Sequence, residues 1–278
     1  MYKMHNNMIL NKINSMGGVF FVPHKKFISM LRRRFHSSGI HPSNASNGVY
    51  GVAENLKLLP PNKVDAECIG VALIHKEHRI MIEKNESKNP SYKQATEGML
   101  ASDNFVWGEY LVDQYEIPNY DTIDYDYPGL TSAYLMSNSG VYNGQPHIPN
   151  DISQWTGVMS DWNGKSNSEV LKKIGATEQG SYAISGNLLN GFINSSDALG
   201  FYDWYIPSCP QMSLIYMRMV DINDILYLIG GKMFQASTEA YMTSSECNDR
   251  NYWAVSGFGQ VGVSDKRNPK RIRLIRDL

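Results

Sequence analysis

The segment between residues 209 and 231 constrains the fold most, because it carries one apolar stripe at helical spacing and ends in two glycines. Its apolar side chains recur at intervals of three and four residues, which predicts a helix over 209–229 that packs into the core. The pair Gly230–Gly231 is typical of a helix C-terminus. The stripe consists of Met212, Ile215, Tyr216, Met219, Ile222, Ile225, Leu226 and Ile229.

Other parts of the chain show the two-residue alternation of β-strands. Residues 68–84 predict a hairpin with a polar turn at Lys76–His78. A shorter helix is predicted to begin at Ser166 or Asn167 and to end before Gly175. Alternation is clearest in two groups, Val71, Leu73, Ile80 and Ile82 in the hairpin, and Ile272 and Leu274 opposite Arg271 and Arg273 near the end.

Length and charge restrict the classes of partner. The chain has 278 residues, a net charge of −1 and 42% hydrophobic residues, which suits one large domain or two modest ones. This charge balance gives no reason to expect nucleic acid as a partner. Apolar runs are too short for membrane insertion, and the first 26 residues lack a secretory pattern, so we expect a protein made in a cytoplasm and not exported by a signal peptide.

Residues for catalysis or metal binding are sparse. The three cysteines lack disulfide or zinc spacing, and we expect free thiols. No phosphate loop, nucleophile elbow or zinc-protease motif occurs, and no His follows His147, so the residues indicate a non-enzymatic protein. His75 and His78 lack a third ligand nearby. We predict no metal or cofactor, and calcium dependence stays open, because the acids between 113 and 126 do not match the twelve-residue calcium loop.

The C-terminal part resembles a known family. The sequence GFYDWYIPSCPQMSLIY at 200–216 is similar to a Gly-x-x-Asp-Trp-x-Leu-Pro-Ser segment of C-type lectin-like domains. These domains occur in Bacteroidetes and their phages, and in variable proteins diversified by retroelements. The same order of motifs continues with Ile229-Gly230-Gly231, the segment Tyr241, Ser244, Ser245 and Glu246, then Trp253 and the strand 271–276.

The resemblance covers residues 185–278 well and 48–110 loosely, the latter through GVALIHKEHRIMI and WGEY. Two positions depart from the family pattern, because Met242 stands where Trp is frequent and Gln211 stands where Glu is frequent. Related sulfatase-modifying enzymes use a cysteine pair that Cys209 and Cys247 do not match, so their activity is not carried over.

The resemblance implies an α+β fold, with a β-rich N-terminal region followed by a C-type lectin-like domain that has two helices and a small antiparallel sheet. The expected division is an N-terminal attachment arm over 1–47, a β-rich region over 48–130 and the lectin-like domain over 131–278. Arg32, Arg33 and Arg34 in the arm suit either contact with an acidic partner or a solvated helix end.

In such folds the loops at one end of the strands present side chains, while Trp253 and Val255 are expected to point inward. The stretch 247–251, the turn 258–260 and the loop 265–268 are therefore the predicted ligand-binding surface, with Tyr252 and Phe258 as rigid anchors. The predicted site residues are Cys247, Asn248, Asp249, Arg250, Asn251, Phe258, Gln260, Asp265, Lys266 and Asn268.

The resulting hypothesis is a phage virion fibre or surface protein whose lectin-like tip binds a host glycan or protein. Its N-terminal region would contact other virion proteins, and the protein would form a homo-oligomer. One alternative is a purely structural virion decoration or connector protein, and another is a bacterial surface-associated binding protein. A third is an oxidase- or hydrolase-like enzyme that uses Cys247.

Overall fold

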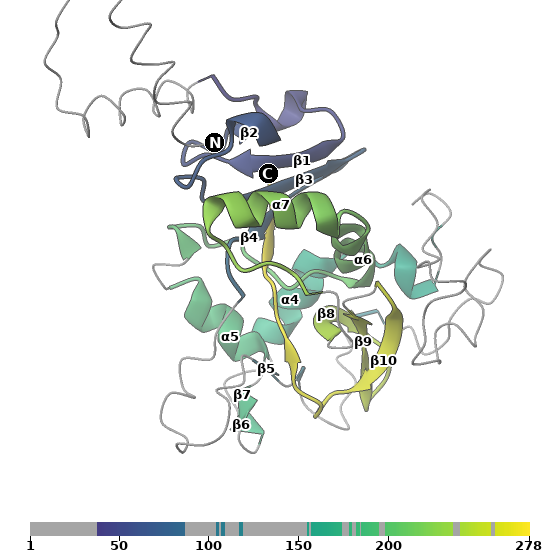
Figure 1. The fold of residues 1–278 in the computed structure, drawn as a ribbon. Helices are drawn as coiled ribbons and strands as arrows, with labels where there is room; N and C mark the ends of the chain where they lie inside the picture. The colour runs from purple at the N-terminus through teal and green to yellow at the C-terminus, as the bar shows by residue number, and fades with distance from the viewer. Residues whose placement is uncertain are drawn as a thin grey trace, which may run out of the picture.

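The computed structural model describes residues 38–86, 104–105, 107–108, 117–118, 155, 157–173, 178–179, 182–183, 185–194, 198–235, 240–256 and 259–278. Two five-stranded sheets and four α-helices make up most of this part of the chain (Figure 1). The strands are β1 (Gly48–Val52), β2 (Leu58–Leu59), β3 (Gly70–His75), β4 (His78–Glu83), β5 (Asn104–Phe105), β6 (Glu178–Gln179), β7 (Tyr182–Ala183), β8 (Ala240–Glu246), β9 (Asn251–Ser256), β10 (Val261–Asp265), β11 (Lys270–Arg271) and β12 (Ile275–Asp277). The helices are α4 (Gly164–Lys173), α5 (Ser185–Phe192), α6 (Cys209–Met217) and α7 (Met219–Ile229), with short 3-10 turns η1 (Pro42–Asn44), η2 (Pro61–Lys63) and η5 (Gly157–Ser160).

The first sheet, in the order β12-β4-β3-β1-β2, joins the two ends of the described chain. The predicted hairpin is confirmed as β3 and β4, with His75 opposite His78 and Lys76 in the left-handed region at φ 53°. Strand β12 pairs antiparallel with β4, so Ile275 lies opposite Ile82. The last strand, β12, therefore completes a sheet whose other strands are the first four in the described part of the chain.

Both faces of this sheet are buried. Val71 and Leu73 face a core cluster that includes α6 and α7, whereas Ala72 and Ile74 face a second cluster that includes α5. The alternation in the sequence thus separates two apolar environments. When both faces of a sheet are covered, apolar residues occupy both sides of its strands. A sheet with one solvated face instead alternates between apolar and polar residues.

The second sheet, in the order β10-β9-β8-β11-β5, carries the candidate site. Strands β8, β9 and β10 form an antiparallel meander, and β11 runs parallel to β8. Trp253 and Val255 of β9 are buried, at 1% and 0% exposure, which confirms their predicted inward orientation. The chain then leaves this sheet after β11 and enters the first sheet as β12.

The predicted single helix over 209–229 is two helices, α6 and α7. The break lies at Arg218, whose φ of −114° and ψ of 18° leave the helical region. Helix α6 packs against β8 and β9 of the second sheet, whereas α7 packs against β1 and β3 of the first. A single straight helix would not pack along both sheets, and the chain therefore changes direction at Arg218 and forms two helices. The predicted stop is confirmed, because Gly230 adopts the left-handed conformation at φ 71°.

The start of the shorter helix is also shifted. Helix α4 begins at Gly164, so Ser166 and Asn167 lie within the helix and do not cap it. The buried Asn167 side chain donates instead to the Asp161 carboxylate at 3.0 Å. Sequence patterns locate helix ends only to within a few residues, because neighbouring segments compete for the same polar groups.

Arg273, which the alternation places opposite Ile272 and Leu274, is a buried cation. Its side chain is 0% exposed, and the alternation in the sequence did not predict this burial. The guanidinium donates to the carbonyls of Glu83, Lys84 and Lys232 at 2.7–3.2 Å. It also lies 4.5 Å from the centre of the Phe234 ring. Crossing between two sheets buries both sides of this segment, and backbone carbonyls together with the Glu86 carboxylate at 3.7 Å provide the polar contacts.

Two of the motifs that carry the family resemblance meet in space. Asp203 forms a two-point ion pair with Arg276, at 2.8 and 3.0 Å. The neighbouring Tyr205 exchanges backbone hydrogen bonds with Ile275 at 2.8 and 3.0 Å. The members of each pair are at least seventy positions apart in the sequence, so the motif order reflects packing of the last strand against the segment before α6.

The Asp203–Arg276 pair predicts a defined pH dependence of stability. Burial opposes ionisation of Asp203, but the hydrogen bond and charge of Arg276 outweigh it and hold the carboxyl pKa below its usual 3.8. The pair therefore stabilises the fold above pH 3.8, and its contribution disappears as the pH falls through the lower folded-state pKa. Asp203→Asn is expected to reduce the free energy of unfolding by about 1 kcal/mol near pH 7, and the difference should vanish below the folded-state pKa.

Urea denaturation of both proteins from pH 7 to pH 2.5 measures this difference. In an Arg276→Gln background, Asp203→Asn should show almost none of the pH-dependent part. A difference that stayed constant down to pH 2.5 would contradict the assignment.

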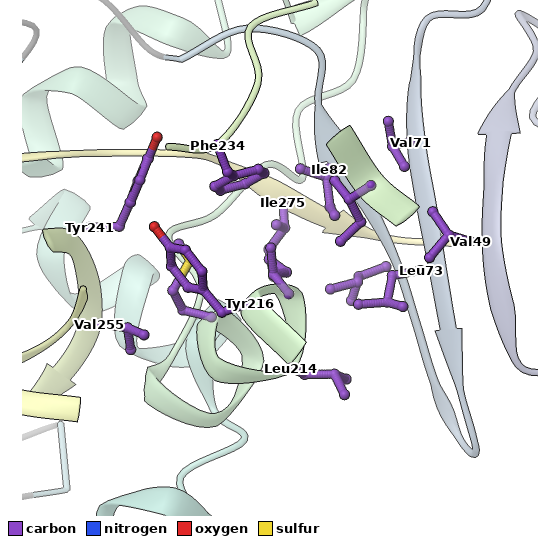
Figure 2. Close-up of a cluster of buried hydrophobic side chains, with 14 of the residues drawn as sticks. Val49, Val71, Leu73, Ile82, Leu214, Tyr216, Phe234, Tyr241, Val255 and Ile275 are labelled. Atoms are coloured by element: carbon purple, nitrogen blue, oxygen red, sulfur yellow. The ribbon is translucent and has the colours of Figure 1, made fainter. Parts of the chain in front are cut away.

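The two regions share one core. Figure 2 shows Val49, Val71 and Ile82 of the first sheet in the same cluster as Tyr241 and Val255 of the second, with Tyr216 of α6 between them. The α+β class is confirmed. The boundary at residue 130 lies outside the described residues, and the lectin-like assignment of 131–278 stays a prediction. Within the described part of the chain, no helix is long and apolar enough to cross a membrane.

Candidate binding rim

The segment 241–251 divides into a buried strand and an accessible turn. The Ser245 hydroxyl donates to the buried Asp161 carboxylate at 2.6 Å and accepts from the backbone N–H of Cys209 at 2.9 Å. Burial raises the pKa of Asp161 above 3.8, although hydrogen bonds from Ser245, Asn163 and Asn167 act in the opposite direction. The Ser-Ser part of this motif is therefore structural, because it ties β8 to α6 and to the start of α4.

The turn between β8 and β9 is built around Asn248. Its side-chain oxygen accepts from the backbone N–H groups of Arg250 and Asn251 at 3.0 and 2.9 Å, and from the Asn251 amide at 3.0 Å. An Asn side chain that bonds to the backbone two and three residues ahead stabilises a tight turn. The side chains of Asn248 and Asn251 thus shape the turn, while Arg250 is exposed and Asp249 is partly exposed.

The loop after β10 is built in a similar way around Asp265. Its carboxylate accepts from the backbone N–H of Arg267 at 2.8 Å and forms a two-point pair with the Arg267 guanidinium at 3.0 and 3.1 Å. The bonds from Arg267 are the main reason that the pKa of Asp265 lies below 3.8. Arg267 keeps 59% of its side chain exposed, and Asn268 beside it is exposed too.

The sheet brings this turn and this loop together. Strands β9 and β10 pair with Asn251 opposite Asp265, so the turn before β9 and the loop after β10 lie at the same end. The backbone N–H of Lys266 donates to the carbonyl of Arg250 at 2.8 Å. We call the joined residues 247–251 and 265–268 the rim.

A buried ion pair supports the rim from below. The ammonium group of Lys266 bonds to the Glu246 carboxylate, with the two side chains 0% and 1% exposed. The ammonium lies 4.8 Å from the centre of the Trp107 ring, which itself stacks on Tyr252. The Trp107 backbone N–H donates to the Lys266 carbonyl at 3.0 Å. Side chains from three other segments, Glu246, Trp107 and Tyr252, therefore support the loop from inside.

Two predicted contact residues are not presented to solvent. Cys247 is 3% exposed and belongs to the core, and Lys266 is fully buried. The prediction that both lie on the surface is wrong. Cys247 directly follows the last residue of β8, and its side chain still packs in the core. For Lys266, the carboxylate of Glu246 on β8 and the Trp107 ring attract the ammonium inward.

A third part of the predicted surface lies elsewhere. Val255 pairs with Val261, so Gln260 is at the opposite end of β9 and β10 from Asn251. The Val255–Val261 pair is four residues along the strands from the Asn251–Asp265 pair, which corresponds to roughly 13 Å. Successive turns of an antiparallel meander lie at alternate ends, so Gln260 does not join the rim. Phe258 lies outside the described residues, as do the acids at 113, 116, 121, 124 and 126.

The predicted loop 265–268 contains Arg267, although Arg267 was not named among the site residues, and Trp107 was not predicted to support the site. Arg267 lies between two predicted contact residues, and its place in a polar loop is a signal that was available. The role of Trp107 has no local signal, because it depends on a contact with β8 through the Trp107 indole N–H and the Thr243 carbonyl at 2.8 Å.

The exposed part of the rim presents two cations, one partly exposed acid and one amide, namely Arg250, Arg267, Asp249 and Asn268. Such groups form hydrogen bonds with hydroxyls, carboxylates and amides. Among the described residues, no group of three or more His, Cys, Asp or Glu side chains is placed to hold a metal ion. The His78 ring instead stacks on Trp162 with 3.8 Å between ring centres.

Comparisons with known proteins assign no family. No protein-family model matches the chain, and no curated protein is similar to it. Among solved structures, the chain is similar to a fimbrial protein from Bacteroides ovatus ATCC 8483, with 17% sequence identity and a TM-score of 0.43. The match covers 84% of this chain and 49% of the fimbrial protein, so the chain spans about half its length. This likeness is too distant to assign a fold or a function.

Proposed function

We propose that the protein is a non-enzymatic binding protein that contacts a polar partner, a glycan or a protein surface, through the rim. The observation that carries this proposal is the hydrogen bond between Lys266 and Arg250, which joins two polar loops into one surface above a buried base. A preorganised surface binds with less loss of conformational entropy than two independent loops.

The distribution of exposed groups supports contact rather than catalysis. Arg250, Arg267 and Asn268 are exposed, whereas the candidate nucleophile Cys247 is buried in the core. Burial also raises the pKa of the thiols of Cys209 and Cys68. A neutral buried thiol is a weak nucleophile, because the thiolate is the reactive form.

The biological setting that we propose is a virion fibre or surface protein that attaches to a host glycan or protein. The motifs at 200–216 and 271–276 support this setting through their family resemblance, and their contact through Asp203 and Arg276 shows that both motifs belong to one packed unit. The same rim would serve a bacterial surface-associated binding protein.

Removing the exposed rim groups is the direct test. The variant Arg250→Ala, Arg267→Ala and Asn268→Ala is expected to weaken binding at least about tenfold, because each truncation of a central contact costs on the order of 1 kcal/mol. Its melting temperature should change little, since these side chains are exposed. Binding is measured with the labelled full chain on a glycan array and on a panel of intact bacterial cells.

A matched control removes two cations and one amide outside the rim, at Lys63, Lys173 and Asn62, all of which are exposed. This control should bind like the unmodified protein. Equal binding by the rim variant and the control would show that the rim is not the contact surface. The absence of any binding by the unmodified protein on either panel would favour a purely structural role.

A further inference from the structure

Strand β10 is an open edge of the second sheet. It has five residues, Val261–Asp265, and within the described part of the chain only β9 pairs with it. Figure 1 shows β10 at the outer side of this sheet. The other edges are shorter or partly covered, because β5 has two residues, and β2 and β12 each form a bridge on their outer side, with Ile40 and Tyr205. Among the described strands, β10 is therefore the longest edge without an outer neighbour.

The two ends of the β9–β10 pairing show which backbone groups of β10 point outward. The carbonyl of Gln260 accepts from β9, and the N–H of Lys266 donates to the residue before β9, both at 2.8 Å. Bonded and non-bonded pairs alternate along an antiparallel ladder, and the register between these two bonds has no shift. The N–H and C=O groups of Val261, Val263 and Asp265 therefore point away from β9.

The side chains of β10 leave room for a further strand. Val263 lies on the same face as the buried Val261 but is 46% exposed. The other face carries only Gly262 and Ser264, which are small. The strand contains no Lys, no Pro and no bulge, which are the usual protections of an edge, and its charged residue, Asp265, is at its end. An edge of this kind pairs readily with another extended strand.

Strand β10 is complementary to a second copy of itself. In an antiparallel pairing centred on Val263, this residue lies opposite Val263 of the second copy, and Val261 lies opposite Asp265. The outward groups of these three residues then face one another, and each such pair exchanges two backbone bonds. The Asp265 carbonyl already accepts from Asn268 at 2.9 Å, and its second lone pair is available for this bond.

This register also avoids steric and electrostatic conflict. Gly262 lies opposite Ser264 of the second copy, so no bulky side chains meet on that face. The two Val263 side chains meet on the other face and cover apolar area that is exposed in one copy. A pairing centred on Asp265 would instead place two carboxylates directly opposite each other, which is destabilising.

We propose that two copies of the chain pair through β10, antiparallel and centred on Val263, and form one continuous sheet. The contact consists of one short strand from each copy, so it belongs to the small and weak class of interfaces, and dimerisation depends on concentration. Only Asp265 is shared with the rim, and the proposal does not rest on the binding role of the rim. Antiparallel pairing places the two rims at opposite ends of the paired strands.

Sedimentation equilibrium of the full chain, over about a hundredfold range of concentration, tests the proposal. The unmodified protein should change from monomer to dimer. Val263→Pro should raise the dissociation constant at least about tenfold, because it removes an outward N–H from both copies but no bond to β9. Val263→Lys should have a similar effect, because two cations would meet at the centre of the pairing. Melting temperatures check that each variant is folded.

Val220→Lys is the matched control, because Val220 is 70% exposed but belongs to α7. It should associate like the unmodified protein. Amide hydrogen exchange gives a second measurement that needs no substitution. Exchange of the Val263 N–H should slow as the concentration rises, whereas the N–H groups of Gly262 and Ser264, which face β9, should not respond. A protein that stays monomeric throughout the range, equal association of the Val263 and Val220 variants, or Val263 exchange that is independent of concentration would each overturn the proposal.

Discussion

Replacing Lys266 with Met is expected to lower the free energy of unfolding by about 3–5 kcal/mol. The substitution removes the ammonium group that pairs with Glu246, and both side chains are essentially inaccessible to water. A carboxylate that stays in the core without this cation loses its electrostatic compensation and does not regain hydration. The loss is measured by urea denaturation with matched fluorescence and circular dichroism signals.

Two further variants separate the ion pair from the shape of the side chains. Combining Lys266→Met with Glu246→Leu should cost much less than the single change, because a buried ion pair replaced by apolar residues of similar volume is often neutral. Lys63→Met on the exposed 3-10 turn η2 should stay within about 0.5 kcal/mol of the unmodified protein. A single Lys266→Met variant as stable as the Lys63 variant would contradict the buried pair.

The same substitution should also weaken the rim. Lys266 provides the backbone N–H that bonds to Arg250, and its carbonyl accepts from Trp107. Loss of the buried ammonium removes the contact with the Trp107 ring that holds this residue inward. Both variants carry Met at 266, and only the single variant keeps the Glu246 carboxylate without its cation, so comparing their binding reports how far the rim depends on the charge balance at its base.

Gly186→Ala in α5 is expected to destabilise the protein by about 3 kcal/mol or more. A Cβ atom at this position would lie 1.9 Å from the carbonyl oxygen of Leu171 and 2.6 Å from its carbonyl carbon. Both atoms belong to the backbone of α4, so the clash is relieved only if the two helices separate. Thermal and urea denaturation measure the effect.

Gly191 in the same helix is the matched control. A Cβ atom there would meet nothing within 4 Å. Alanine is favoured over glycine within helices by about 1 kcal/mol, so Gly191→Ala should leave stability unchanged or raise it. Opposite signs for the two substitutions would confirm that α4 and α5 cross at Gly186. A loss of stability at Gly191 equal to that at Gly186 would instead indicate a general effect of glycine replacement in α5.

Local patterns predicted much of the secondary structure. The hairpin of β3 and β4 followed from alternation around a polar turn, and the end of α7 followed from Gly230. These two features depend on residues close together in the sequence, and short-range sterics and hydrogen bonding act over that distance. The inward orientation of Trp253 and Val255, which the family resemblance implied, is also confirmed.

The candidate site was predicted only in part. The polar stretch 247–251 and the loop 265–268 were recognised, and the pairing of β9 with β10 places them side by side. Gln260 was grouped with them although the strand direction puts it at the other end. Its position follows from antiparallel connectivity, which a list of polar loops does not represent.

The sequence by itself determined the β3–β4 hairpin, the helical character of 209–229 with its end at Gly230, and the polar character of the turns at 247–251 and 265–268. Only the tertiary structure decided that α6 and α7 separate at Arg218, that Arg273 and Lys266 are buried, and that β12 joins the first sheet. The physical reason is that a charged side chain is stable inside a protein only when distant segments supply its partners. Those partners, the carbonyls of Glu83, Lys84 and Lys232 for Arg273 and the carboxylate of Glu246 for Lys266, meet their cations only in the folded chain.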